Sequence, residues 1–118
     1  MCTFQIPGTK KLLINENDVI GIVADGRGCD FYVITNVQKK EWVRIDSSHN
    51  IGHYKKLLVN SPLFDAHKKY IVNIEQVAAY DGNYILEMKI YIPKVLKVAK
   101  RKRKLFKERL NNSRSLLK

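Results

Sequence analysis

Histidine, serine and carboxylate side chains could carry out acid–base or metal chemistry, and they are scattered along this sequence. No Ser-His-Asp order accompanies a nucleophile elbow, and no recognisable motif pairs two carboxylates. His49 and His53 stand four residues apart, as zinc ligands on a helix can, without the other ligands of a zinc motif. His67 is followed by two lysines, whose charges disfavour its protonation. We therefore expect a protein that is not an enzyme and has neither a metal site nor a cofactor.

Lysine and arginine side chains form three clusters whose chemistry is more distinctive. Arg27 lies in an Asp-Gly-Arg-Gly loop, Lys68 and Lys69 follow His67, and residues 100–104 are all basic. Such side chains contact the phosphate backbone of nucleic acids, and arginine can also bind guanine edges. The clusters form a DNA-binding footprint only if the fold brings them to one face. His67 is expected either to contact phosphate or to orient the chain at the start of a strand.

The basic residues are concentrated near the C-terminal end of the sequence. The 118 residues carry a formal net charge of +11. Residues 1–93 hold 11 Lys and Arg against 10 Asp and Glu, whereas residues 94–118 hold 11 against 1. This distribution favours a polyanionic partner such as nucleic acid. The alternatives are an acidic membrane surface, a solvated helix or a disordered end.

The elements that must position these clusters are mostly strands. Short apolar and aromatic runs bounded by turn residues predict strands at residues 12–14, 19–23, 31–34, 42–45, 70–72, 74–80, 84–92 and 95–98. Helical spacing predicts one short helix over residues 50–60, and residues 99–110 are rich in helix formers. No βαβ alternation is visible, so we expect a mainly β fold of antiparallel sheets with one short internal helix and a basic C-terminal helix. Trp42 is expected on a sheet face rather than as a platform for base stacking.

The length and composition of the chain suit one compact domain. We expect residues 1–118 to form a single domain that ends in a basic helix or tail over residues 99–118. Cys2 and Cys29 cannot make a disulfide framework, and no apolar run near the start is typical of a signal peptide. No stretch reaches the roughly 20 apolar residues that a membrane span requires. These features predict a cytoplasmic protein without a membrane partner.

Residues 63–73 carry a resemblance to a known family. Their sequence, LFDAHKKYIVN, has Phe64, His67 and the run Tyr70-Ile71-Val72-Asn73 at a spacing that resembles the signature of the LytTR family. This family comprises bacterial DNA-binding domains usually found at the C-terminal end of response regulators. The resemblance covers residues 7–110, where Asp18-Val19-Ile20 is similar to the family's opening strand. Val98-Ala99-Lys100-Arg101 is similar to its closing Val-Ser-Arg-Arg motif, with residues 92–95 as a rival match.

The resemblance implies an elongated β fold of packed sheets whose loops enter successive major grooves and the minor groove between them. It implies DNA-facing positions in the loop of residues 27–30, at Lys68, and at Lys100 or Arg101. Together with the basic clusters, it gives the predicted DNA-binding residues Arg27, Asp30, His67, Lys68, Lys69, Lys100, Arg101, Lys102 and Arg103. Three positions depart from the family pattern, because Lys69 and Ala99 replace serines and Asp65 stands where the family often has a base.

The predicted function is sequence-specific binding of double-stranded DNA at promoter direct repeats, in bacterial transcription regulation. The alternative is a structural protein, or one that binds RNA or DNA through its basic tail without reading the sequence. The resemblance also implies a second copy on an adjacent repeat. Because 118 residues leave no room for a receiver beside this domain, we expect either a standalone regulator or a fragment of a longer one. A receiver domain, attached or separate, is a further partner that the resemblance implies.

Overall fold

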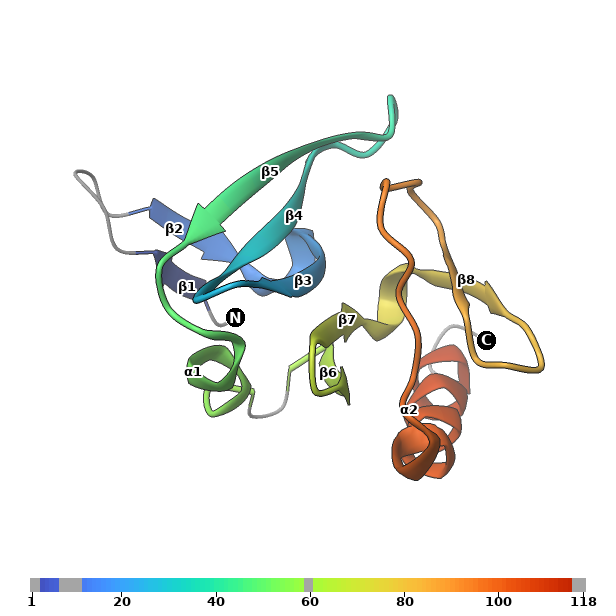
Figure 1. Cartoon of the computed structure of the whole chain (residues 1–118). Coiled ribbons are helices and arrows are strands. Elements are labelled where there is room, and N and C mark those ends of the chain that lie inside the picture. Colours follow the sequence, from blue (N-terminus) through green and yellow to red (C-terminus); the bar gives the residue numbers. More distant parts are fainter. Residues whose placement is uncertain (1–2, 7–11, 59–60, 116–118) are drawn as a thin grey trace.

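The computed structural model of the chain describes residues 3–6, 12–58 and 61–115 and is mostly β. A five-stranded sheet has the order β5-β4-β3-β7-β6, and two further sheets pair β1 with β2 and β8 with β9 (Figure 1). The strands are β1 (Thr3–Ile6), β2 (Leu12–Asn15), β3 (Val19–Asp25), β4 (Gly28–Asn36), β5 (Glu41–Ser47), β6 (Leu63–His67), β7 (Tyr70–Asn73), β8 (Val77–Tyr80) and β9 (Leu86–Met88). The helices are α1 (Ile51–Lys55) and α2 (Arg103–Ser115), with 3-10 turns η1 (Glu16–Asp18), η2 (Ile74–Gln76) and η3 (Lys100–Lys102). The predicted fold class, antiparallel β sheets with a short internal helix and a basic C-terminal helix, is confirmed.

Strand β3 lies in the middle of the five-stranded sheet and is buried on both faces. Val19 and Ile22 belong to an apolar cluster that includes residues of α1. Ile20 and Val23 belong to a second cluster, which includes residues of α2. Because both faces are covered, the β3 sequence is a continuous apolar run rather than an alternation of apolar and polar residues.

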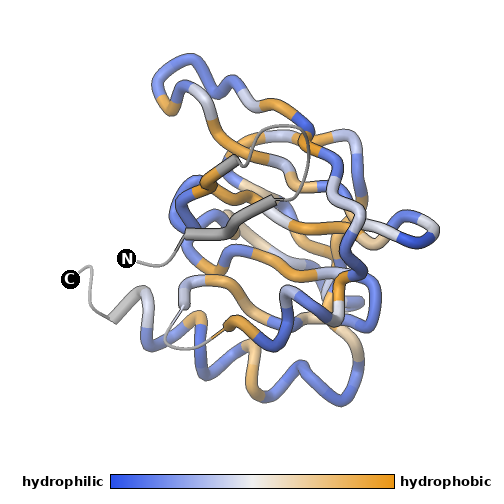
Figure 2. The backbone as a smooth tube through the Cα atoms, turned by 90° about the vertical axis from the view of Figure 1, so that its left-hand side faces the viewer, coloured by the Kyte–Doolittle hydropathy of each residue, from blue (hydrophilic) through white to orange (hydrophobic). Residues whose placement is uncertain are grey.

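Helix α2 is part of the core and not a detached basic tail. Phe106 is fully buried, and its ring centroid lies 5.4 Å from that of Tyr80 and 6.0 Å from that of Phe64. Leu110 is buried one turn later, and Arg109 Nη2 donates to the carbonyl oxygen of Ser61 at 2.7 Å. Apolar residues accordingly line the inner strands in Figure 2, with hydrophilic turns outside them.

The predicted strands over residues 84–92 and 95–98 are wrong in extent. Strand β9 covers only Leu86–Met88, and residues 95–98 form an isolated bridge, Ile85 with Lys97, instead of a strand. Pro93 has no N–H to donate, which interrupts any ladder here. The segment is held instead by buried side chains, chiefly Leu96, and by a 2.8 Å bond from Leu86 N to Leu96 O. The strand predicted over residues 74–80 also begins late, because η2 occupies its first three positions.

The predicted internal helix is shorter than expected. Asn50 is its N-cap, and the Asn50 side chain accepts a hydrogen bond from His53 N at 3.0 Å. The helix ends at Lys55, well before the predicted end, and residues 59–60 of the prediction lie outside the described residues. The C-terminal helix is also preceded by η3, so its α-helical part begins at Arg103 rather than Ala99.

Two glycines shape the turn between β3 and β4 in different ways. Gly26 has a φ of +59°, a conformation that a side chain would strain. A Cβ added at Gly28 would lie 2.1 Å from the carbonyl oxygen of Ser47, so this glycine permits a close approach of β5. The turn therefore exposes Arg27 while the strands on either side of it stay tightly paired.

We predict that Leu96→Ala lowers the free energy of unfolding by about 2–5 kcal/mol, because it leaves a cavity beside β3. Leu96 is fully buried, and its Cδ1 lies 3.0 Å from the position that a Cβ on Gly21 would take. Urea denaturation measures the change. The neighbouring Val95→Ala is the matched control, since Val95 is 64% exposed and its loss should change stability by no more than about 0.5 kcal/mol. Equal effects of the two substitutions would contradict the packing described here.

Candidate nucleic-acid interface

Two of the three basic clusters lie on turns at the same end of the five-stranded sheet. Strand β3 pairs with β4 on one side and β7 on the other, so that Val23 lies opposite both Asp30 and Tyr70. Beyond this pair, Ala24 N donates to Lys69 O at 2.9 Å, which joins the β3–β4 and β6–β7 turns. Arg27, Lys68 and Lys69 are exposed on these turns. Residues more than forty positions apart in the sequence thus become neighbours.

The third cluster reaches the same end of the sheet through the segment that leads into η3. The β6–β7 pairing is irregular between Asp65 and His67, and Ala66 O accepts a hydrogen bond from Ala99 N at 2.8 Å. A pocket of about 370 Å³ lies at this junction, lined by His67, Asn83, Ile85, Lys97, Val98, Ala99, Lys100 and Arg103. We call the exposed residues Arg27, Lys68, Lys69, Lys97, Lys100 and Arg101 the basic face.

His67 orients the β6–β7 turn. Its Nδ1 accepts a hydrogen bond from Lys69 N at 3.1 Å, and its ring centroid lies 4.9 Å from that of Tyr70. Partial burial lowers the pKa of His67, and the nearby charges of Lys97, Lys68, Lys55 and Lys69 lower that pKa further. The neutral ring therefore carries its proton on Nε2, because Nδ1 acts as the acceptor. This geometry matches the orienting role considered from the sequence and leaves a ring N–H donor for a phosphate.

Asp30 is buried within the sheet rather than exposed with Arg27. It lies in β4 directly opposite Asp46 of β5, and its Oδ2 is 3.9 Å from Arg44 Nη1. Burial raises the pKa of Asp30, and a hydrogen bond and the charge of Asp46 raise it further, against the opposing effect of Arg44. The loop positions implied by the resemblance therefore differ in accessibility: Arg27 projects outward and Asp30 does not.

The basic residues of η3 and the first residue of α2 divide into two groups. Lys100 and Arg101 are exposed, whereas Lys102 and Arg103 are partly covered. Lys102 Nζ lies 3.6 Å from a carboxylate oxygen of Asp65. The Arg103 guanidinium lies over the Tyr84 ring, 4.5 Å from its centroid, in a cation–π contact. Arg103 is therefore less available to phosphate than Lys100 and Arg101.

Sequence reasoning missed Lys97 and Asn83 as residues of this surface. Lys97 lay within a segment predicted to be a strand, and no functional role was predicted for Asn83. The hydrogen bond from Val98 N to Tyr84 O, at 3.0 Å, brings the two together. No local sequence signal reports this pairing, because it joins segments on either side of an irregular loop.

The tryptophan, the histidine pair and the cysteine considered from the sequence make contacts within the fold. Trp42 is half-buried, and its ring lies 5.3 Å from that of Tyr32, as expected for a sheet-face residue. The rings of His49 and His53 stack at 4.1 Å. In the part of the chain that the structure describes, no group of three His, Cys, Asp or Glu side chains could hold a metal ion. Burial raises the pKa of the Cys29 thiol to about 12, which keeps it protonated and unreactive.

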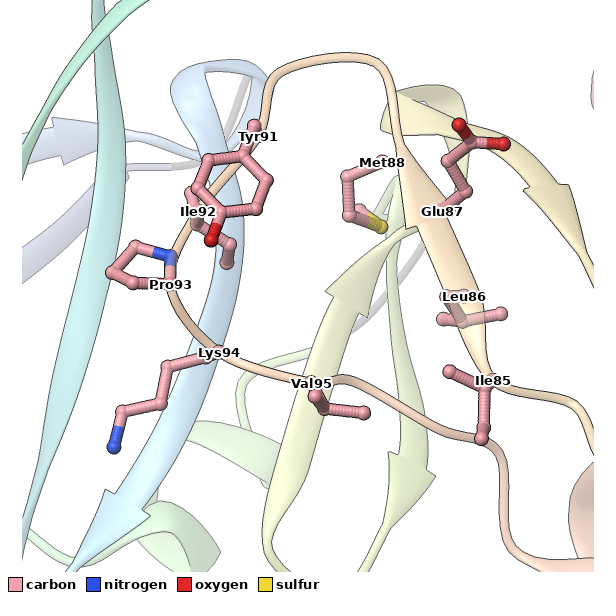
Figure 3. A pocket seen from close by; sticks show the side chains of 9 residues that line it. All are labelled: Ile85, Leu86, Glu87, Met88, Tyr91, Ile92, Pro93, Lys94 and Val95. Carbon is pink, nitrogen blue, oxygen red and sulfur yellow. The ribbon is translucent and has the colours of Figure 1, made fainter.

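An apolar groove of about 450 Å³ lies between β9 and the loop of residues 91–95 (Figure 3). The exposed side chains of Tyr91 and Val95 contribute to its lining. None of the three basic clusters lines this groove, although Ile85 lines both it and the pocket at the η3 junction. Among the described residues, no helix has the length and apolar character that crossing a membrane requires.

Comparison with known proteins decides the family. The family model of the LytTr DNA-binding domain matches residues 10–111. This chain belongs to the LytTR family of DNA-binding domains. Its structure is similar to the LytTr DNA-binding domain of a response regulator from Bacillus cereus, with a TM-score of 0.66 and 14% sequence identity over 92% of this chain and 95% of that chain. No curated protein matches the sequence. LytTR domains bind DNA in transcription regulation and are not a catalytic family.

We predict that stability falls more steeply in acid for this LytTR domain than for its His67→Gln variant. The folded state lowers the pKa of His67, so the unfolded chain binds a proton more readily. The contribution of the neutral His67 ring to the free energy of unfolding is therefore fully present above the ordinary histidine pKa of about 6.5. It is lost as the pH falls through the lower pKa that His67 has in the folded state. Urea denaturation between pH 7.5 and pH 5 tests this. The same pH dependence in both proteins would mean that His67 does not titrate in this way.

Proposed function

We propose that this chain is a sequence-specific reader of double-stranded DNA in bacterial transcription regulation. The observation that carries the proposal is the convergence of three basic clusters, from β3–β4, β6–β7 and η3, at one end of a single sheet. Each cluster is anchored by backbone hydrogen bonds to strands whose side chains are buried. Rigid turns that carry exposed cations are suited to entering a groove at a fixed orientation.

The shape of the turns supports reading of bases as well as binding of phosphates. The major groove is about 12 Å wide and admits a two-stranded β ribbon. Lys68 lies beyond the last β6–β7 pair, His67 with Tyr70, and Arg27 lies beyond the last β3–β4 pair, Asp25 with Gly28. Both are at turn tips, and they are the residues that we assign to base edges. Lys97, which precedes η3, and Lys100 and Arg101, which belong to η3, are assigned to phosphates or to a neighbouring groove.

The proposal extends to the biological setting. We infer that the target is a promoter carrying direct repeats, that a second copy binds the adjacent repeat, and that a receiver domain, attached or separate, supplies the signal. Residues 1–118 would then act as one cytoplasmic DNA-binding domain. The similarity to a domain of a response regulator supports this setting.

Binding of RNA or DNA without sequence preference is the alternative function. The net charge of +11 would support it equally well. A basic tail separate from the body would also favour it, but Phe106 and Leu110 anchor α2 in the core. The two functions differ in how strongly unrelated duplex competes, since a specific complex resists such competition.

We predict that Lys68→Ala and Arg27→Ala reduce discrimination between a cognate duplex and a scrambled duplex by about 1–3 kcal/mol each, the value of a good base contact. The cognate duplex is selected from a randomised pool, and fluorescence titration at several salt concentrations gives both affinities. Lys104→Ala is the charge-matched control, because Lys104 is exposed on α2. It should weaken both duplexes about equally and reduce the salt slope by no more than about 0.9. If all three substitutions weaken both duplexes equally, the alternative function is favoured.

A further inference from the structure

Asp65 lies among the cations next to the basic face, where an isolated carboxylate would oppose the binding of phosphate. Its Oδ1 lies 2.9 Å from Lys55 Nζ, and its Oδ2 lies 3.6 Å from Lys102 Nζ. Lys55 ends α1 and Lys102 ends η3, so one carboxylate joins two segments on either side of the β6–β7 hairpin. The Lys55 and Lys102 side chains are only 19% and 27% exposed, which makes these ion pairs less screened than those on an open surface.

Lys55 makes a second contact that links Asp65 to the turn itself. Its Nζ also donates to the carbonyl oxygen of His67, at 2.7 Å. The preceding carbonyl, that of Ala66, accepts from Ala99 N. The carbonyl of His67 is therefore hydrogen-bonded to Lys55 of α1, and the carbonyl of Ala66 is hydrogen-bonded to Ala99, the residue that precedes η3. Asp65 holds the Lys55 side chain through one carboxylate oxygen and the Lys102 side chain, at the end of η3, through the other.

Lys55, Asp65 and Lys102 form a cluster with a net positive charge, so Asp65 does not act as an isolated acid here. Each oxygen of Asp65 faces an ammonium group, so Lys55, Asp65 and Lys102 together carry a charge of about +1 at neutral pH. The carboxylate withdraws two lysines from general contact with phosphates and holds them in one arrangement. Removing its charge would leave two ammonium groups that repel each other.

We propose that Asp65 is a positioning residue for DNA recognition, which holds the β6–β7 turn and η3 at a fixed separation so that Lys68 and Lys100 meet the duplex together. This inference rests on the proposed function. Such a residue increases specificity while it lowers the affinity for unrelated DNA, because the geometry is fixed and two cations are neutralised in part. The departure of Asp65 from the family pattern is then a feature of how this chain recognises DNA.

Two substitutions with opposite charge changes test the role of Asp65. Asp65→Asn adds one net positive charge and Lys55→Gln removes one, yet both remove the ion pair between Lys55 of α1 and Asp65 of the β6–β7 hairpin. Affinities are measured for the duplex selected from a randomised pool and for its scrambled counterpart. Glu87→Gln is the matched control, because Glu87 is exposed on β9, outside the basic face, and the change adds the same charge as Asp65→Asn.

We expect discrimination between the two duplexes to fall about three- to tenfold in both Asp65→Asn and Lys55→Gln, a part of what a full base contact contributes. Asp65→Asn should also bind the scrambled duplex more tightly, with a salt slope steeper by about 1 to 2 as the lysines become available to phosphates. Asp65→Glu should retain most of the discrimination, and Glu87→Gln all of it. Unchanged discrimination in both test variants would overturn the proposal, as would changes that simply follow net charge.

The controls separate this inference from the proposed function. If the unaltered protein does not distinguish the two duplexes, the proposed function fails. If it distinguishes them and Asp65→Asn strengthens both complexes by the same factor, only the positioning role fails. Circular dichroism shows whether each variant is folded. If Asp65→Asn is unfolded, Lys55→Gln alone tests the proposal.

Discussion

The pairing of β3 with both β4 and β7 is the constraint on which the basic face depends. Antiparallel pairing places the β3–β4 turn and the start of β7 at the same end of the sheet, and burial of β3 on both faces fixes the register of each pair. A slip of one residue would move every side chain of the strand to the opposite face. The separation between Arg27 and Lys69 is therefore set by the apolar core and not by the charged residues themselves.

The same core also holds α2 in place although its many positive charges repel one another. Residues 94–118 carry ten net positive charges, yet Phe106 and Leu110 keep α2 against the sheet. The Arg103 guanidinium over Tyr84 and the ion pairs of Asp65 reduce the local repulsion. Arg103, Lys55 and Lys102 have partners in the absence of DNA, so these three side chains would lose little further conformational entropy on binding.

The strands were largely predictable, and their arrangement was not. Apolar runs identified β3, β4, β5 and β7, and the turn residues between β4 and β5 indicated their pairing. The pairing of β3 with β7 joins residues about fifty positions apart and leaves no local signal. The resemblance implied a DNA-facing position at Asp30, whereas Asp30 is buried and lies opposite Asp46 on the adjacent strand β5. The path of residues 90–98 was also unpredictable, because its buried residues Ile90, Ile92, Leu96 and Val98 alternate with exposed ones as in a strand, yet the segment forms only one isolated bridge.

The bond between Ala66 O and Ala99 N has a consequence for synthesis of the protein. Translation produces the β3–β4 and β6–β7 turns well before residue 99, and a further stretch of chain must leave the ribosome before α2 can cover the second apolar cluster. The surface that carries all three sets of cations thus forms only when the last element docks. A nascent or prematurely terminated chain would present the β3–β4 and β6–β7 turns without the η3 cations, so only the completed domain carries the whole surface.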